Sequence, residues 1–235
     1  MLRNAYKTMV PEETRIQMRH RFDRVFCKPA EDKITLGERC RWTILTRGLD
    51  QDSVIYSGGV GEDISFELAL IDRFGCTIQI FDPSPAGQAT IARAGAYRDK
   101  LRYKALGLSG SSQPLRFQAK QWEGETFFYK DADETISSTH EVTVPCTTIA
   151  AEMEANGHSR IDLLKLDIEG FEYDALESCI ERSILPRQIC VEFHNFMPTG
   201  SHLTTAKTIW KLRSAGYRLV HKSYYDWTFL YRERP

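Results

Sequence analysis

Residues 53–84 read Ser-Val-Ile-Tyr-Ser-Gly-Gly-Val-Gly-Glu-Asp-Ile-Ser-Phe-Glu-Leu-Ala-Leu-Ile-Asp-Arg-Phe-Gly-Cys-Thr-Ile-Gln-Ile-Phe-Asp-Pro-Ser, and this stretch decides the fold. Residues 54–56 are strand formers that run straight into a glycine-rich turn at 58–61. Because glycine has no Cβ, such a turn brings the backbone close to a ligand. Apolar residues at helical spacing follow, and a second strand over 77–81 ends on an acidic residue. This order is typical of nucleoside-binding α/β folds.

Asp82 is the acidic residue that ends the second strand. It lies roughly 20 residues past the glycines, where such folds place the carboxylate that holds a ribose. A carboxylate suits this role because it accepts two hydrogen bonds from a vicinal diol. The alternative is that Asp82 caps the helix that starts beside Pro83. The stretch therefore predicts a ligand with a ribose.

From Val54 onward, strand-like and helix-like segments alternate, which predicts a parallel sheet with helices on both faces. Nearly continuous apolar sequence predicts buried strands at 161–168 and 188–193. Residues 109–135 break the alternation and are expected to form either a lid or a passive surface hairpin. Aromatic residues in this insertion could stack on an acceptor or form the hairpin's own core: Trp122, Phe127, Phe128 and Tyr129.

Length and composition are those of an ordinary folded protein, with 42% apolar and 27% charged residues in a chain of 235. We expect one domain over residues 41–235 and a helical extension over residues 1–40. No apolar run approaches the roughly 18 residues of a membrane span, and the first residues lack the apolar core of a signal peptide. A cytoplasmic protein is therefore expected. Its six cysteines, none spaced as CxxC, are expected to be free thiols.

Charge is distributed unevenly along the chain. Residues 1–48 hold 11 Lys and Arg against 6 Asp and Glu, a net charge of +5, whereas the remainder carries −6. A basic arm of this kind could contact an anionic partner or the acidic body of a second subunit, giving a homo-oligomer. A solvated helix that packs on the domain explains it equally well. The pattern does not indicate a nucleic-acid partner.

A second polar cluster follows the buried strand at 161–168. Lys165, Asp167, Glu169 and Glu172 stand where this strand stops and the chain bends at Gly170. Ligands of open α/β sheets bind at the carboxyl ends of the strands, so this charge is expected at the mouth of a site. The alternatives are that Glu169 caps the next helix and that Glu172 meets its dipole.

His194 follows the other buried strand, beside Glu192. A lone histidine is often only a structural hydrogen-bonding group. Its place at the end of a strand next to a second acidic cluster also makes it a candidate catalyst. An unperturbed pKa near 6.5 suits a general base at neutral pH.

Taken together, these clusters resemble the FkbM-type methyltransferases, a branch of the class I enzymes that use S-adenosylmethionine. The matching pieces are residues 54–66, 81–84, 161–173 and 191–194, with Gly216-Tyr217-Arg218-Leu219 near the end. The Lys-x-Asp-x-Glu-Gly-x-Glu run is the most specific of them. The resemblance extends over roughly residues 41–232.

The resemblance implies a class I methyltransferase fold, a Rossmann-like seven-stranded sheet whose last strand is antiparallel. It implies that S-adenosylmethionine lies over the glycine turn, with Asp82 on its ribose and Asp167 near its methionine end. Many class I enzymes begin the glycine motif with an acidic residue, and this chain has Tyr56 and Ser57 there; Glu62 or Asp63 could take its place. The residues predicted to bind the cofactor are Ser57, Gly58, Gly59, Gly61, Asp63, Asp82, Pro83 and Asp167.

The expected reaction is transfer of a methyl group to a hydroxyl oxygen. The resemblance points to a small-molecule or glycan acceptor, a sugar or a secondary metabolite. His194 is the first candidate base and Glu169 the second, with Asp167 beside them. A rival version uses Asp167, Glu169, Glu192 or His194 to hold Mg²⁺, which would lower the pKa of the acceptor; our prediction has no metal.

Two other functions remain open on the same sheet. An NAD-dependent oxidoreductase predicts a tighter G-x-G-x-x-G than the Gly-Gly-Val-Gly-Glu-Asp at 58–63. A non-catalytic nucleoside-binding or scaffold protein predicts cofactor binding without methyl transfer.

Overall fold

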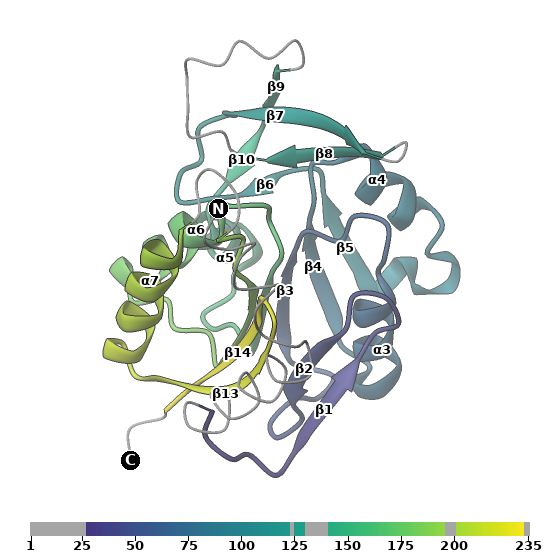
Figure 1. Cartoon of the computed structure of the whole chain (residues 1–235). Coiled ribbons are helices and arrows are strands. Elements are labelled where there is room, and N and C mark those ends of the chain that lie inside the picture. The colour runs from purple at the N-terminus through teal and green to yellow at the C-terminus, as the bar shows by residue number, and fades with distance from the viewer. Residues whose placement is uncertain (1–26, 123–124, 130–140, 196–200, 233–235) are drawn as a thin grey trace, which may run out of the picture.

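The computed structural model describes residues 27–122, 125–129, 141–195 and 201–232. Its centre is a seven-stranded sheet with the order β13-β14-β12-β11-β3-β4-β5 (Figure 1). Neighbours from β12 to β5 run parallel, and β14 pairs antiparallel with both β12 and β13. The predicted sheet with an antiparallel last strand is therefore confirmed. The strands are β3 Val54–Gly58, β4 Thr77–Phe81, β5 Leu101–Lys104, β11 Leu163–Leu166, β12 Gln188–Glu192, β13 Tyr217–Ser223 and β14 Asp226–Tyr231.

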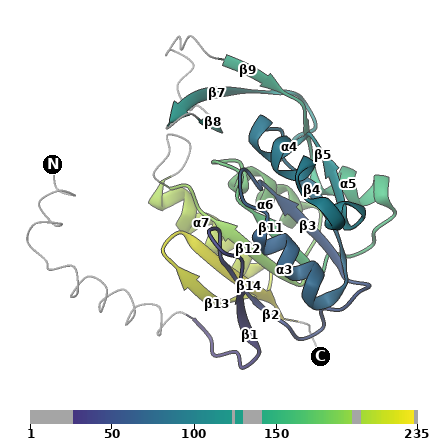
Figure 2. The same ribbon diagram turned by 90° about the vertical axis from the view of Figure 1, so that its right-hand side faces the viewer.

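Helices cover both faces of this sheet, as Figures 1 and 2 show. On one face lie α3 (Ser65–Phe74) and α4 (Pro85–Ala92), followed by the short 3₁₀ helix η1 (Gly95–Lys100). On the other lie α5 (Ile149–Asn156), α6 (Glu172–Glu181) and α7 (His202–Ser214). Two separate apolar cores, one for each face, fix the helices to the sheet.

Local sequence signals set the ends of these helices. Gly75 follows α3 with φ 69°, a left-handed conformation that closes the last turn and that glycine adopts without steric cost. Helix α5 begins at Thr148, whose hydroxyl accepts the N–H of Ala151, and it ends at Gly157 with φ 67°. Both helices thus end where a glycine follows the last turn.

A small hairpin packs on the face that carries α3. It consists of β1 (Lys33–Leu36) and β2 (Trp42–Leu45), paired antiparallel. The backbone N–H of Lys28 also donates to the carbonyl of Leu219 at 2.8 Å. Residues 28–40, which we assigned to the extension, therefore belong to the folded unit. Residues 1–26 of the predicted helical extension lie outside the described residues.

The insertion forms a sheet of its own at one end of the molecule, at the top of Figure 1. Strand β7 (Leu115–Trp122) pairs antiparallel with β8 (Glu125–Tyr129) and with β9 (Glu141–Val144). Below it, β6 (Gly107–Leu108) and β10 (Cys146–Thr147) form a short parallel pair. The side chains of Trp122, Phe127, Phe128 and Tyr129 lie outside the described part, so their predicted role stays open.

Two expectations from composition concern the cysteines and the membrane-spanning segments. All six cysteines lie in the described ranges and are free thiols, as expected. Within those same ranges, no helix has both the length and the apolar character needed to cross a membrane.

Candidate functional site

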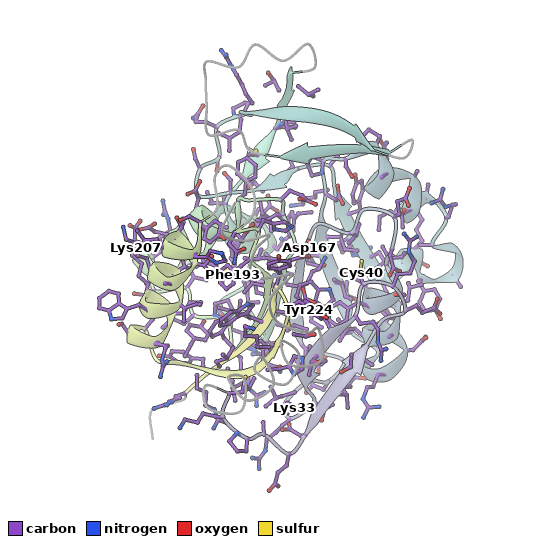
Figure 3. All side chains as sticks on the ribbon, viewed as in Figure 1. Lys33, Cys40, Asp167, Phe193, Lys207 and Tyr224 are labelled. Carbon is purple, nitrogen blue, oxygen red and sulfur yellow. The ribbon has the colours of Figure 1, made fainter. Side chains whose placement is uncertain are left out.

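A cavity of about 320 Å³ opens at the carboxyl ends of β3, β4 and β11. This is where the strand order reverses, because the chain passes from β3 outward to β4 while β11 lies on the other side. Open α/β sheets bind ligands at such a point. The wall comprises Arg39, Cys40, Gly59, Val60, Gly61, Glu62, Asp63, Phe81, Asp82, Pro83, Ser84, Ala86, Gly107, Leu108, Asp167, Ile168, Glu169 and Phe171. Asp167 and Cys40, both labelled in Figure 3, reach it from different segments.

The glycine turn forms one wall of the cavity. Gly59 and Gly61 have φ values of 75° and 49°. A Cβ on Gly59 would lie 1.8 Å from the carbonyl oxygen of Asp167, whereas a Cβ on Gly61 would have nothing within 4 Å. Packing against Asp167 therefore requires a glycine at position 59. At position 61 no protein atom fills the space that a side chain would take, and this open space lies beside the cavity. Gly58 is still paired within the sheet and is not part of the wall.

Asp82 lies in the wall but already holds the turn. Its Oδ2 accepts the N–H groups of Val60 and Gly61, both at 2.8 Å, and its Oδ1 accepts that of Ser84 at 2.7 Å. The helix cap is Ser84 rather than Asp82, because the Ser84 hydroxyl accepts the N–H of Gly87. Asp82 thus shapes the turn, and the ribose contact stays a prediction.

Asp63, also in the wall, fixes the loop before β2. Its carboxylate accepts the N–H groups of Arg39 at 3.2 Å, Cys40 at 2.7 Å and Ser65 at 2.9 Å. Burial acts to raise the pKa of Asp63, but these backbone hydrogen bonds outweigh it and lower the pKa. An ionised Asp63 with this many partners is a structural anchor for the rim of the cavity.

Ser57 does not reach the cavity. It is buried at the end of β3, and its hydroxyl donates to Glu67 at 2.6 Å. Glu67 lies on α3 and is itself only 1% exposed. The cofactor contact predicted for Ser57 is therefore not provided by its side chain in this geometry, because the hydroxyl points to Glu67 inside the protein.

The segment after β11 supplies the acidic wall. Asp167 lies 3.6 Å from Lys165 through its Oδ2, and both Asp167 and Glu169 line the cavity. Glu169 adopts φ 53° and Gly170 φ 100°, a backbone bend rarely taken by residues with a side chain. Helix α6 is capped by Phe171 without a side-chain hydrogen bond, so Glu169 is not its cap. Glu169 instead lines the cavity, with its carboxyl 3.4 Å from Nε2 of His194.

His194 lies behind this wall and is only 3% exposed. Its Nε2 is 3.4 Å from Glu169 and 3.8 Å from Asp167. Glu172, fully buried, accepts the backbone N–H groups of His194 at 2.8 Å and of Gly170 at 2.9 Å. Glu172 therefore orients the segment that carries His194 and the bend that carries Glu169. This role of Glu172 was not predicted from the sequence.

The electrostatics distinguish the two candidate bases. Burial lowers the pKa of His194, but the hydrogen bond and charge of Glu172, with Glu169 and Asp167, outweigh it and raise the pKa to about 10. Burial raises the pKa of Glu169 to about 7, with Asp167 and Glu172 adding to the rise and His194 opposing it. At neutral pH His194 is thus an imidazolium without a free lone pair, whereas Glu169 is close to its titration point.

Two further acids extend the cluster. Glu192 and Asp226 stand opposite each other across β12 and β14. Burial and the charge of Asp167 raise the pKa of Glu192 to about 8 and that of Asp226 to about 6. Ligand atoms of Asp167, Glu192 and His194 all lie within 4.8 Å of one another. Three of the four residues considered for Mg²⁺ thus converge; Glu169 is not part of that set.

Sequence reasoning missed Glu67 and Asp226. A signal existed for Glu67, because it interrupts the apolar face formed by Ile64, Leu70 and Ile71. No local signal existed for Asp226, since its approach depends on the pairing of β14 with β12.

Fold and cavity together define an α/β protein of the class I methyltransferase type. Residues 60–219 match the model of the family described as "Methyltransferase FkbM domain", which is more than half of the chain. The chain belongs to this family, as the sequence resemblance predicted. The family's description is that of a methyltransferase domain.

Comparisons with individual proteins are more distant. A search of curated proteins finds no match. The crystal structure of Methyltransferase FkbM from Methylobacillus flagellatus KT is 12% identical with a TM-score of 0.41, covering 78% of this chain and 44% of that one. The Methanococcus jannaschii fibrillarin pre-rRNA processing protein is 10% identical with a TM-score of 0.44, covering 88% and 86%. The chain thus spans less than half the length of the first of these structures.

Proposed function

We propose that this methyltransferase transfers a methyl group from S-adenosylmethionine to a hydroxyl oxygen of a small molecule or glycan. One observation carries the choice of a hydroxyl acceptor. Glu169, held by an unusual backbone bend, presents a carboxyl in the cavity wall next to Asp167. A hydroxyl must lose its proton as it attacks, and a carboxylate in this place can accept it.

The cavity fits the donor on grounds of shape and chemistry. Gly61 leaves the wall open where a Cβ would stand, and Pro83, Leu108 and Phe81 supply apolar surface nearby. The acidic residues Asp82 and Asp167 lie in two other parts of the wall. The apolar surface suits the adenine ring of the donor, Asp82 suits its ribose diol, and Asp167 suits its positively charged methionine end.

When bound, S-adenosylmethionine supplies a methyl group that is already activated by a positively charged sulfur. The protein must therefore mainly align the acceptor oxygen, which is worth up to about 7–11 kcal/mol in well-oriented reactions. Glu169 accepts the hydroxyl proton. His194, protonated and held by Glu172, does not take the proton but stabilises the ionised form of Glu169 from 3.4 Å away.

Isothermal titration calorimetry with S-adenosylhomocysteine tests the donor site first. We expect saturable binding of S-adenosylhomocysteine and none of NADH. NADH binding in place of S-adenosylhomocysteine would instead support the oxidoreductase. Transfer is then measured with S-adenosylmethionine carrying a labelled methyl group against a panel of sugars and phenolic metabolites, read by mass spectrometry.

Glu169→Gln is the decisive variant for the base. We expect unchanged affinity for S-adenosylhomocysteine and a loss of turnover of about 10²–10⁴-fold, the usual contribution of a general base. Glu181→Gln, an exposed substitution on α6, is the matched control. If the wild type binds donor but methylates no hydroxyl in the panel, the non-catalytic alternative gains support. Full turnover by Glu169→Gln would remove the base assignment.

A metal-assisted version of the same transfer is the second candidate, favoured by the convergence of Asp167, Glu192 and His194. In that version a divalent cation would lower the pKa of the acceptor hydroxyl. We prefer the metal-free version because Glu172 hydrogen-bonds the backbone of His194 and lies 3.4 Å from its Nδ1, which favours the protonated imidazole over a metal ligand. Assays with EDTA and with added Mg²⁺ separate the two versions: the metal-free version predicts equal rates.

A further inference from the structure

A charged network lies buried beneath the glycine turn, and it contacts the cavity wall at Gly59 and Asp167. At its centre is Lys165 on β11, whose side chain is only 3% exposed. Its ammonium group donates to the carbonyl of Gly59 and lies 3.6 Å from Asp167. It also stands over the ring of Trp42, 5.5 Å from the ring centre. Lys165 thus touches the turn, the acidic segment and the hairpin strand β2 at once.

Glu67 supplies the opposite charge from the helix α3. Lys165 and Ser57 are direct neighbours across β11 and β3. The Ser57 hydroxyl donates to Glu67 at 2.6 Å, and Glu67 interacts electrostatically with Lys165. Serine stands where many class I methyltransferases carry the acid that begins the glycine motif. In this chain the carboxylate of Glu67, ten residues after Ser57, reaches the Ser57 side chain instead.

Stability alone does not account for such a network. Removing an ammonium and a carboxylate from water costs several kcal/mol each, and replacing a buried ion pair by apolar residues is often neutral or stabilising. The flanking residues Leu163, Leu164 and Leu166 show that β11 is otherwise apolar. The charge of Lys165 is therefore explained better by the segments that it holds in place than by a contribution to the stability of the core.

Lys165 holds the two segments that form the donor cavity. Its hydrogen bond keeps the Gly59 carbonyl pointing inward, so that the N–H groups that follow can reach Asp82 and the cavity. Its charge also faces the Asp167 carboxylate from 3.6 Å, and this attraction holds Asp167 in place in the cavity wall. Movement of Lys165 would therefore displace both segments together.

We infer that Lys165 is a positioning residue for the methyl-donor site and that Glu67 is its internal counter-charge, replacing the acid missing from the glycine motif. The inference rests on the proposed use of S-adenosylmethionine. Neither residue is in the cavity wall, so neither touches the donor or the acceptor. Their effect passes through Gly59 and Asp167.

The test compares three variants: Lys165→Met, Glu67→Gln and the double variant. Lys165→Met leaves Glu67 buried without its cation, so we expect a lower melting temperature. The double variant removes both charges and is expected to regain most of that stability. Affinity for S-adenosylhomocysteine is expected to stay about tenfold or more below the wild type in the double variant, the effect of losing a hydrogen bond to a charged group.

Amide hydrogen exchange of the ligand-free protein gives a second readout. The amides of Val60 and Gly61 are expected to exchange about tenfold faster in the double variant, since the turn loses its anchor. Lys104→Met is the control, because it removes another lysine–carboxylate contact, with Glu152 at 2.5 Å, that lies outside the cavity wall. It is expected to leave both readouts unchanged.

The outcomes separate this inference from the proposed function. If the double variant binds S-adenosylhomocysteine as tightly as the wild type, or its turn amides exchange at the wild-type rate, Lys165 is only structural and the inference fails alone. If the wild type itself does not bind S-adenosylhomocysteine, the proposed donor fails and the inference fails with it.

Discussion

The Glu172 carboxylate accepts the backbone N–H of His194 at 2.8 Å while its other oxygen accepts the N–H of Gly170 at 2.9 Å. One fully buried side chain thus ties the end of β12 to the bend that carries Glu169. Glu172 also lies 3.4 Å from Nδ1 of His194, which makes it the main anionic partner of that ring. The arrangement explains why His194 is charged and Glu169 is placed in the cavity wall.

Replacing Glu172 with Gln is expected to destabilise the protein by about 3–5 kcal/mol, because it leaves the His194 charge buried without its main partner. The pKa of His194 should fall, since the hydrogen bond and charge that raise it are weakened. Chemical denaturation and an NMR titration of the His194 ring measure the two effects. An unchanged His194 pKa would contradict the assignment of Glu172, and Glu181→Gln on the same helix serves as the control.

The rate of methyl transfer should depend on the ionisation of Glu169. Its pKa is raised to about 7, mainly by burial, and the groups facing it are His194, Asp167, Glu172 and Lys165. Only the carboxylate form accepts a proton, so kcat/KM should rise with pH through about 7 and level off above it. A pH–rate profile tests this, and the rise should be absent from the residual activity of Glu169→Gln. A rate that falls as pH increases through this range would exclude Glu169 as the base.

Stability of the ligand-free protein should show the opposite trend with pH. The pKa of His194 is raised in the folded state to about 10 and those of Glu169 and Glu192 to about 7 and about 8. The folded protein therefore binds more protons than the unfolded chain between the unfolded and folded pKa values. The contributions are fully present below about pH 4.5 for the acids and about 6.5 for His194, and they are lost as pH rises.

Urea denaturation at pH 6 and at pH 9 measures this linkage. The free energy of unfolding is expected to be lower at pH 9. The variant Glu192→Gln should reduce the difference, because its uncharged side chain no longer has to ionise next to Asp167. Equal stability at both pH values would show that these groups are not shifted in the direction described.

Sequence patterns predicted the parts of the fold that depend on local chemistry. Strand β4 occupies the residues expected for it, 77–81, and helix α3 covers the apolar helical pattern before it, because strand propensity and helical spacing act over a few residues. The hairpin strand β1 was missed, although Ile34 and Leu36 alternate with polar neighbours. Four residues give too short a pattern to separate a strand from a loop.

The site was predictable only in part, for reasons of distance along the chain. Asp82, Asp167 and Glu169 meet in one cavity because each ends or follows a parallel strand, and parallel strands end at the same edge. The partnership of Glu67 on α3 with Lys165 on β11 joins residues almost a hundred positions apart, and no local pattern encodes it. The charge state of His194 likewise follows from Glu172, which the sequence presents only as a helix residue.

Alanine at Gly59 and at Gly61 should separate packing from ligand binding. Both residues have positive φ, so alanine costs about 1–2 kcal/mol at either place. At Gly59 the new methyl group would also lie 1.8 Å from the Asp167 carbonyl oxygen, which adds about 1–3 kcal/mol of overpacking. Gly59→Ala should therefore lower the melting temperature more than Gly61→Ala.

Gly61→Ala should instead act on the ligand. Its methyl group meets no protein atom within 4 Å and lies beside the cavity, so the fold should survive while affinity for S-adenosylhomocysteine falls. Calorimetry on the two variants, with melting temperatures from circular dichroism, provides the comparison. Gly157→Ala is the control, because that residue also has positive φ and open space around it but ends α5 away from the cavity wall. Tight binding by Gly61→Ala, equal to that of Gly157→Ala, would mean that the donor does not pass over this turn.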